Sequence, residues 1–163
     1  MPAGPVIVDN TPLVALWTLR RLDLFQLLFD EVLAPAAVYA EFLATERALR
    51  QSALATASWI RPASLADPRR ADTFVGIGRG EAEVLVLAQE RHARLVVIDD
   101  LRARRYARRL AMPLTGTMGL LVQAKREGYL TEVAPLIHEL QMAGIFFSAS
   151  LVADVLMLAG EAE

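Results

Sequence analysis

The sequence predicts an α/β fold with three layers, in which helices cover both faces of a central, mainly parallel sheet. Short β-branched runs alternate along the chain with segments whose apolar residues recur at helical spacing. Strands that alternate with helices in this way form parallel sheets. The chain has 163 residues, of which 55% are hydrophobic. This length suits one domain with a full hydrophobic core, so we expect a single domain over residues 1–163.

The first half of the chain contains three of the expected strands. Val6–Val8 is a β-branched run, and Thr11-Pro12 after it predicts a helix N-cap followed by proline at the first helical position. The expected elements are strand 6–8, helices 13–19 and 22–29, strand 31–33, a helix opened by Pro35 that continues or restarts toward 57, and strand 59–60. The polar, turn-rich interval 62–80 is expected to be a surface loop or mobile flap.

The second half continues the alternation of helices and strands. Its expected elements are helix 81–91, strand 95–98, helix 101–110, strand 113–115, a helix from 116 or 117 to about 127, helix 131–142, strand 145–147 and helix 151–159.

Acidic residues follow two of the predicted strands. Asp9 ends the first strand, and Asp99-Asp100 ends the strand at 95–98. Functional sites of parallel sheets lie beyond the carboxyl ends of the strands, so these acids share one edge. These acids could instead have purely structural roles. Asp9 would then accept hydrogen bonds from backbone amides of the turn after the strand, and Asp99 or Asp100 would cap the next helix. One acid of the adjacent pair can cap the next helix while the other faces the functional site at the sheet edge.

Two glutamates lie on apolar helix stripes. The helical neighbours of Glu41 include Val38, and those of Glu81 include Leu85. A buried carboxylate is costly unless it is paired or bound to a cation. Glu41 is otherwise explained by exposure to solvent, and Glu81 by its favourable place in the first turn of a helix. Glu83 has equally apolar neighbours, so periodicity does not separate it from Glu81.

The composition excludes several other kinds of site. The chain has no cysteine, which excludes disulfides and thiolate metal ligands and is compatible with a reducing cytoplasm. No stretch has the pattern of a signal peptide or the length of a membrane span. The mean hydropathy of +0.36 is high, so an interface that buries apolar surface, such as that of a homodimer, is expected.

Taken in their order along the chain, the acids at 9, 41, 81 and 99 make the sequence resemble a PIN domain. The resemblance is to the compact prokaryotic kind that includes VapC-like toxins. VIVDNTPLVAL resembles the first strand with its Asp and following Ser/Thr, here Asp9 and Thr11. PAAVYAEF is similar to the segment of the second acid, and the third and fourth acids fall at Glu81 and Asp99. Glu at the third position departs from the commoner Asp, and the adjacent Asp100 leaves the fourth position slightly open.

The resemblance implies a ribonuclease that depends on Mg²⁺ or Mn²⁺, acting on RNA as the toxin of a toxin–antitoxin pair, in the cytoplasm and as a homodimer. Hard divalent cations prefer carboxylate oxygens and keep waters, which lets a water serve as nucleophile. The implied ligands, direct or through water, are Asp9, Glu41, Glu81 and Asp99, with Asp100 beside them and Thr11 as a supporting hydrogen-bond donor.

Seven arginines fall between residues 91 and 109, although the net charge is -2. On the helix 101–110, Arg102, Arg105 and Arg109 lie outside the apolar side, and this helix begins beside Asp99. We expect these three arginines to contact RNA phosphates. The alternatives are a solvated helix face or contact with an acidic antitoxin segment.

Two other functions remain open. The first is a non-catalytic PIN-like module that binds RNA or an antitoxin. The second, less favoured, is a phosphatase of the haloacid dehalogenase type, because Asp9 and the residues after it faintly echo the nucleophile loop of that class. That reading leaves Glu41 and Glu81 without a role.

Overall fold

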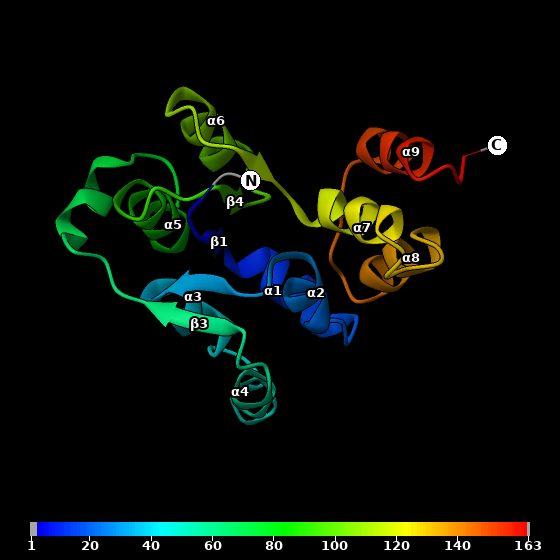
Figure 1. The fold of residues 1–163 in the computed structure, drawn as a ribbon, viewed down its shortest axis with the longest axis horizontal. Helices are drawn as coiled ribbons and strands as arrows, with labels where there is room; N and C mark the ends of the chain where they lie inside the picture. The colour runs from blue at the N-terminus through cyan, green and yellow to red at the C-terminus, as the bar shows by residue number, and fades with distance from the viewer. Residues whose placement is uncertain (1–2, 163) are drawn as a thin grey trace.

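A sheet of five parallel strands forms the centre of the computed structural model, which describes residues 3–162 (Figure 1). The strand order is β3-β2-β1-β4-β5, so the predicted α/β architecture with a parallel sheet is confirmed. The strands are β1 (Val6–Val8), β2 (Val32–Pro35), β3 (Ile60–Ala63), β4 (Leu95–Val97) and β5 (Leu114–Thr115).

Helices follow the strands and supply most of the remaining structure. The helices are α1 (Asn10–Thr18), α2 (Asp23–Phe29), α3 (Ala36–Phe42), α4 (Arg47–Thr56), the 3₁₀ helix η1 (Pro68–Thr73), α5 (Arg79–Glu90), α6 (Leu101–Arg109), α7 (Thr117–Arg126), α8 (Ala134–Met142) and α9 (Ala149–Leu158). In Figure 1, α7, α8 and α9 group at one end of the molecule, and α7 packs against α1 and α9. Helix α5 packs against α3, α6 and η1.

The middle strand of the sheet is β1, whose three residues are all buried. It pairs with β2 on one side, where Ile7 lies opposite Leu33, and with β4 on the other, where Val8 lies opposite Val97. A continuous β-branched run is what a strand buried on both faces requires. The chain builds β2 and β3 on one side of β1 and then β4 and β5 on the other. The carboxyl ends of β1 and β4 therefore flank the point where the strand order reverses, the usual place for a site in such sheets.

The predicted strand at 145–147 is wrong. Gly144 ends the turn after α8 with a positive φ of 85°, and the Ile145 amide donates to the Leu140 carbonyl oxygen at 2.9 Å. Ile145 and Phe147 pack against the hydrophobic core, whereas Phe146 is 75% exposed. The apolar residues of this run therefore anchor the link between α8 and α9 without forming a strand ladder.

Two further expectations need correction. The helix after β1 begins at Asn10, with Asp9 in the N-cap position, so Thr11 lies inside the first turn and is not the cap. The interval 62–80 is not a free flap, because it contains η1 and is tied to α5. Glu90 accepts hydrogen bonds there from the amides of Ala66 at 2.8 Å and Asp67 at 3.1 Å. Within residues 3–162, no helix combines the length and apolar character needed to cross a membrane.

Candidate metal centre

Asp9 lies at the carboxyl end of β1, where its amide donates to the Val97 carbonyl oxygen of β4 at 3.0 Å. This bond fixes the residue where the ends of the two strands meet, and the residue is only 3% exposed. Within the described residues, its buried Oδ1 atom has no hydrogen-bond partner. A buried carboxylate oxygen without a donor is costly unless a cation or proton compensates it.

The electrostatic environment of Asp9 is dominated by burial and by other acids. Burial is the main cause that raises the pKa of Asp9 from 3.8 to about 7, and the negative charges of Glu81, Glu41 and Asp99 add to it. The backbone amide of Asn10 acts in the opposite direction. The three other acids that the resemblance implied as ligands, Glu41, Glu81 and Asp99, therefore lie near enough to influence the Asp9 carboxylate. A divalent cation would relieve this repulsion.

Glu41 and Glu81 reach this edge from two helices that pack together, α3 and α5. The Glu41 carboxylate lies against the backbone of Gly80, where an added Cβ atom would collide with Glu41 Oε1. Desolvation there raises the pKa of Glu41, and the charge of Glu81 raises it further, although the Gly80 amide lowers it. Glycine at position 80 thus lets the first turn of α5 approach Glu41 closely.

Glu83 has a different place from Glu81. Its buried carboxylate accepts a hydrogen bond from the Ala37 amide at 3.1 Å and one from Arg79 Nε at 2.8 Å. Ala37 lies in the first turn of α3, so Glu83 satisfies a backbone donor that the helix itself leaves free. The structure thereby distinguishes two glutamates that helical periodicity could not separate.

Asp99 and Asp100 also have different surroundings. The Asp99 carboxylate accepts from the Thr117 amide at 2.8 Å and from Thr117 Oγ1 at 2.5 Å. Burial raises the pKa of Asp99, while the two Thr117 hydrogen bonds and the charge of Arg104 lower it. Asp100 is exposed and caps α6, accepting from the Ala103 amide at 2.8 Å. The adjacent acids thus divide into one that is bonded to Thr117 and acts on Asp9 and one that caps α6.

Thr117 and Arg104 also lie at this edge, although the sequence did not single them out as site residues. Thr117 is fully buried and opens α7, directly after β5. The sequence signal was a threonine at a helix start beside the end of a strand. Arg104 Nη1 donates to the Ile98 carbonyl oxygen at 2.7 Å, so a guanidinium lies beside Asp99. Thr11, the predicted supporting donor, is exposed in the first turn of α1, and within residues 3–162 its side chain makes no hydrogen bond.

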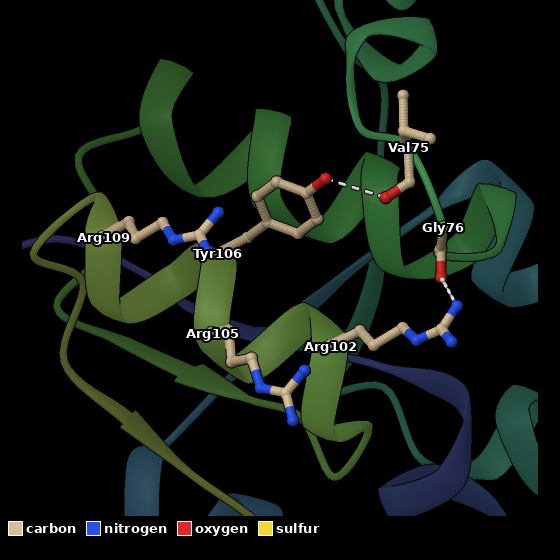
Figure 2. Close-up of a pocket in the computed structure, with 6 residues that line it drawn as sticks. All are labelled: Val75, Gly76, Arg102, Arg105, Tyr106 and Arg109. Atoms are coloured by element: carbon tan, nitrogen blue, oxygen red, sulfur yellow. Dashed lines mark hydrogen bonds between the residues drawn. The ribbon is translucent and has the colours of Figure 1, made fainter.

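The predicted RNA-binding arginines lie on α6, which begins directly after Asp99 and Asp100. Arg102, Arg105 and Arg109 line a hollow together with Tyr106, as Figure 2 shows. The other wall of the hollow comes from Val75 and Gly76. The helix that carries the arginines therefore begins beside the acidic edge of the sheet.

The donor chemistry of the acidic edge fits a hard divalent cation. Its side chains offer carboxylate oxygens, which Mg²⁺ and Mn²⁺ prefer, and Asp9 Oδ1 is a buried oxygen without a donor. As the side chains lie, no group of three or more Asp, Glu, His or Cys residues within 3–162 is close enough to hold an ion together. Asp9 and Asp99 are fixed by the sheet edge, whereas Glu41 and Glu81 have the longer side chains that would have to move toward an ion.

Comparison with known proteins agrees with this arrangement. A search of curated proteins returned no match. A family model described as a PIN domain matches residues 5–161, which is nearly the whole chain. Together with the parallel sheet and the acids at its carboxyl edge, this match shows that the chain belongs to the PIN domain family.

Proposed function

We propose that this protein is a metal-dependent endoribonuclease that cleaves RNA phosphodiester bonds with Mg²⁺ or Mn²⁺. PIN domains are typically nucleases. The observation that carries the proposal is the state of Asp9, a buried acid with an unpartnered oxygen and a pKa raised to about 7. A charged, buried carboxylate without a partner destabilises the folded state, and a cation bound to it would offset that cost.

In this proposal Asp9, Glu41, Glu81 and Asp99 hold the ion, directly or through water. When bound, the divalent cation supplies Lewis acidity and neutralises charge that develops on the scissile phosphate. Thr117 donates to both carboxylate oxygens of Asp99 and so fixes the orientation of that side chain. Asp100 is left out of the ligand set because its carboxylate caps α6.

We further propose that the protein acts in the cytoplasm as the toxin of a toxin–antitoxin pair and forms a homodimer. The toxin assignment is supported by the resemblance of the sequence to VapC-like proteins. Large apolar side chains exposed in the C-terminal part support a partner surface there. These side chains are Met142, Phe146, Leu151, Met157 and Leu158.

The test is the cleavage of an RNA pool by the parent protein and by Asp9→Asn, with Mg²⁺, with Mn²⁺ and with EDTA. We expect the parent to cut with either ion and the variant to lose at least about a hundredfold in rate, since metal ligands supply several kcal/mol of transition-state stabilisation. Far-UV circular dichroism checks that the variant is folded. RNA binding without cleavage by the parent would instead favour the non-catalytic module, and equal cleavage by both proteins would refute the site.

A further inference from the structure

The hollow on α6, here called the α6 pocket, is built by two segments that hydrogen bonds join. It has a volume of about 250 Å³. Tyr106 Oη donates to the Val75 carbonyl oxygen at 2.7 Å, and Arg102 Nη1 donates to the Gly76 carbonyl oxygen at 3.3 Å (Figure 2). The Tyr106 ring also packs edge-on against Phe74, with 5.1 Å between ring centroids. The wall opposite the arginines is therefore held in place.

The α6 pocket carries positive charge that no acid among residues 3–162 pairs with. Among the described residues, no carboxylate lies within 4 Å of the guanidinium of Arg102, Arg105 or Arg109. Arg109 instead lies over the Tyr106 ring, 5.8 Å from its centroid. Several other arginines of the chain do pair with acids: Arg21, Arg50, Arg61, Arg69, Arg70 and Arg79.

The three arginines form one stripe, because positions 102, 105 and 109 are spaced by three and four residues. Seven residues of helix correspond to a length of about 10 Å. Each strand of a nucleic acid duplex carries one phosphate about every 3.4 Å along its axis, so the stripe is long enough to meet more than one phosphate. Guanidinium groups suit phosphate because their planar donors match its acceptor oxygens.

We propose that the α6 pocket binds backbone phosphate of the RNA strand outside the bond that is cut. This inference rests on the proposed ribonuclease function. Since α6 starts directly after Asp99 and Asp100, a strand whose scissile phosphate lies at the acids continues along the arginine stripe. Phosphate contacts carry no sequence information, so the α6 pocket sets the length of RNA that the enzyme requires and leaves base preference unchanged.

The first test measures binding without cleavage, in EDTA, using the Asp9→Asn protein and a fluorescent unpaired oligoribonucleotide. Fluorescence anisotropy across a salt series gives the affinity and its salt dependence. Adding Arg105→Gln and Arg109→Gln should weaken binding to oligo-U and oligo-A equally. It should also reduce the slope of log K against log salt by roughly 0.7 for each lost phosphate contact.

The control is Arg108→Gln, which removes one positive charge from the same helix at a residue that does not line the α6 pocket. We expect its salt slope to stay within error of that of the Asp9→Asn parent. If the double variant keeps the affinity and the slope of the parent, or if Arg108→Gln lowers them as much, the inference is wrong. It is also wrong if the double variant loses binding of polyglutamate but not of RNA, because the stripe would then be a surface for an acidic protein.

A second measurement uses the protein with an intact Asp9 and Mn²⁺. The parent should cleave a longer oligoribonucleotide with a higher kcat/KM than a dinucleotide, and the Arg105→Gln, Arg109→Gln protein should lose that advantage while still cutting the dinucleotide. An unchanged advantage in the double variant would refute the α6 pocket. Absence of cleavage by the parent would refute the nuclease function alone, since the binding test in EDTA decides the α6 pocket independently.

Discussion

At the scale of single residues, the candidate centre combines acids that the backbone fixes with acids that reach toward them. Asp9 and Asp99 follow β1 and β4, so their positions are set by the sheet. Glu41 and Glu81 extend from α3 and α5. No group within residues 3–162 donates a hydrogen bond to Asp9 Oδ1. The raised pKa of Asp9 means that a proton and a cation compete for the same carboxylate.

This competition predicts how stability depends on pH in the metal-free protein. Asp9 has a pKa of about 7 in the folded chain against 3.8 ordinarily, so the folded state binds more protons between these values. The free energy of unfolding should therefore fall as pH rises from about 4 to about 7. Asp9→Asn removes this penalty and should be more stable than the parent at pH 8 in EDTA, by on the order of a few kcal/mol.

Urea denaturation at pH 5 and pH 8, in EDTA, checks the effect. The gain in stability of Asp9→Asn over the parent should be larger at pH 8 than at pH 5. An equal gain at both values of pH would show that Asp9 does not carry the penalty.

The two neighbouring glutamates of α5 give a second prediction. Glu83→Gln should lower the free energy of unfolding by about 1.5–3 kcal/mol, because it weakens charged hydrogen bonds to the Ala37 amide and Arg79. Glu81→Gln should leave the unfolding free energy of the metal-free protein unchanged or raised, yet abolish cleavage. Denaturation and rate measurements on both variants decide the matter, and loss of activity without destabilisation in Glu83→Gln would reverse the two roles.

At the scale of elements, α6 connects the acidic edge with the segment before α5. Its N-cap is Asp100, next to Asp99, and Tyr106 farther along holds the Val75 carbonyl oxygen. The interval 62–80 therefore has a fixed place against α5 and α6. The wall of the α6 pocket depends on that attachment.

Tyr106→Phe tests the attachment. The change removes the hydrogen bond to Val75 but keeps the ring that packs against Phe74. We expect a loss of about 1 kcal/mol in the free energy of unfolding. Amide hydrogen exchange should also speed up around residues 74–78, relative to the core strand β1. Unchanged exchange in that interval would mean that the hydrogen bond does not hold the segment.

The sequence predicted the strands of the sheet and most helices because their apolar periodicity is local. The prediction of a strand failed at Ile145–Phe147. There, Ile145 and Phe147 pack against the core and so anchor the link between α8 and α9, and the backbone of this segment joins no sheet in the described residues. Helical periodicity also could not choose between Glu81 and Glu83, since both have apolar neighbours on α5, and only the resemblance to PIN domains pointed to Glu81. That choice depends on Ala37 and Arg79, and on the packing of α5 against α3, which no local pattern reveals.

At the scale of the whole molecule, the order of the strands brings distant parts of the chain to one edge. β1 and β4 are neighbours although about ninety residues of sequence separate them, and their registered pairing sets Asp9 beside the end of β4. Helices α3 and α5 bring Glu41 and Glu81 to the same edge. We propose that these four carboxylates act as one site for a divalent cation.

The most direct test is titration calorimetry of Mn²⁺ into the parent, Asp99→Asn and Asp100→Asn at pH 8. The last two proteins differ only in which of two adjacent acids loses its charge, and asparagine still serves as an N-cap at position 100. We predict that Asp99→Asn loses Mn²⁺ binding at least about tenfold, whereas Asp100→Asn binds within about threefold of the parent. Equal binding by the parent and Asp99→Asn, or selective loss in Asp100→Asn, would contradict the site described here.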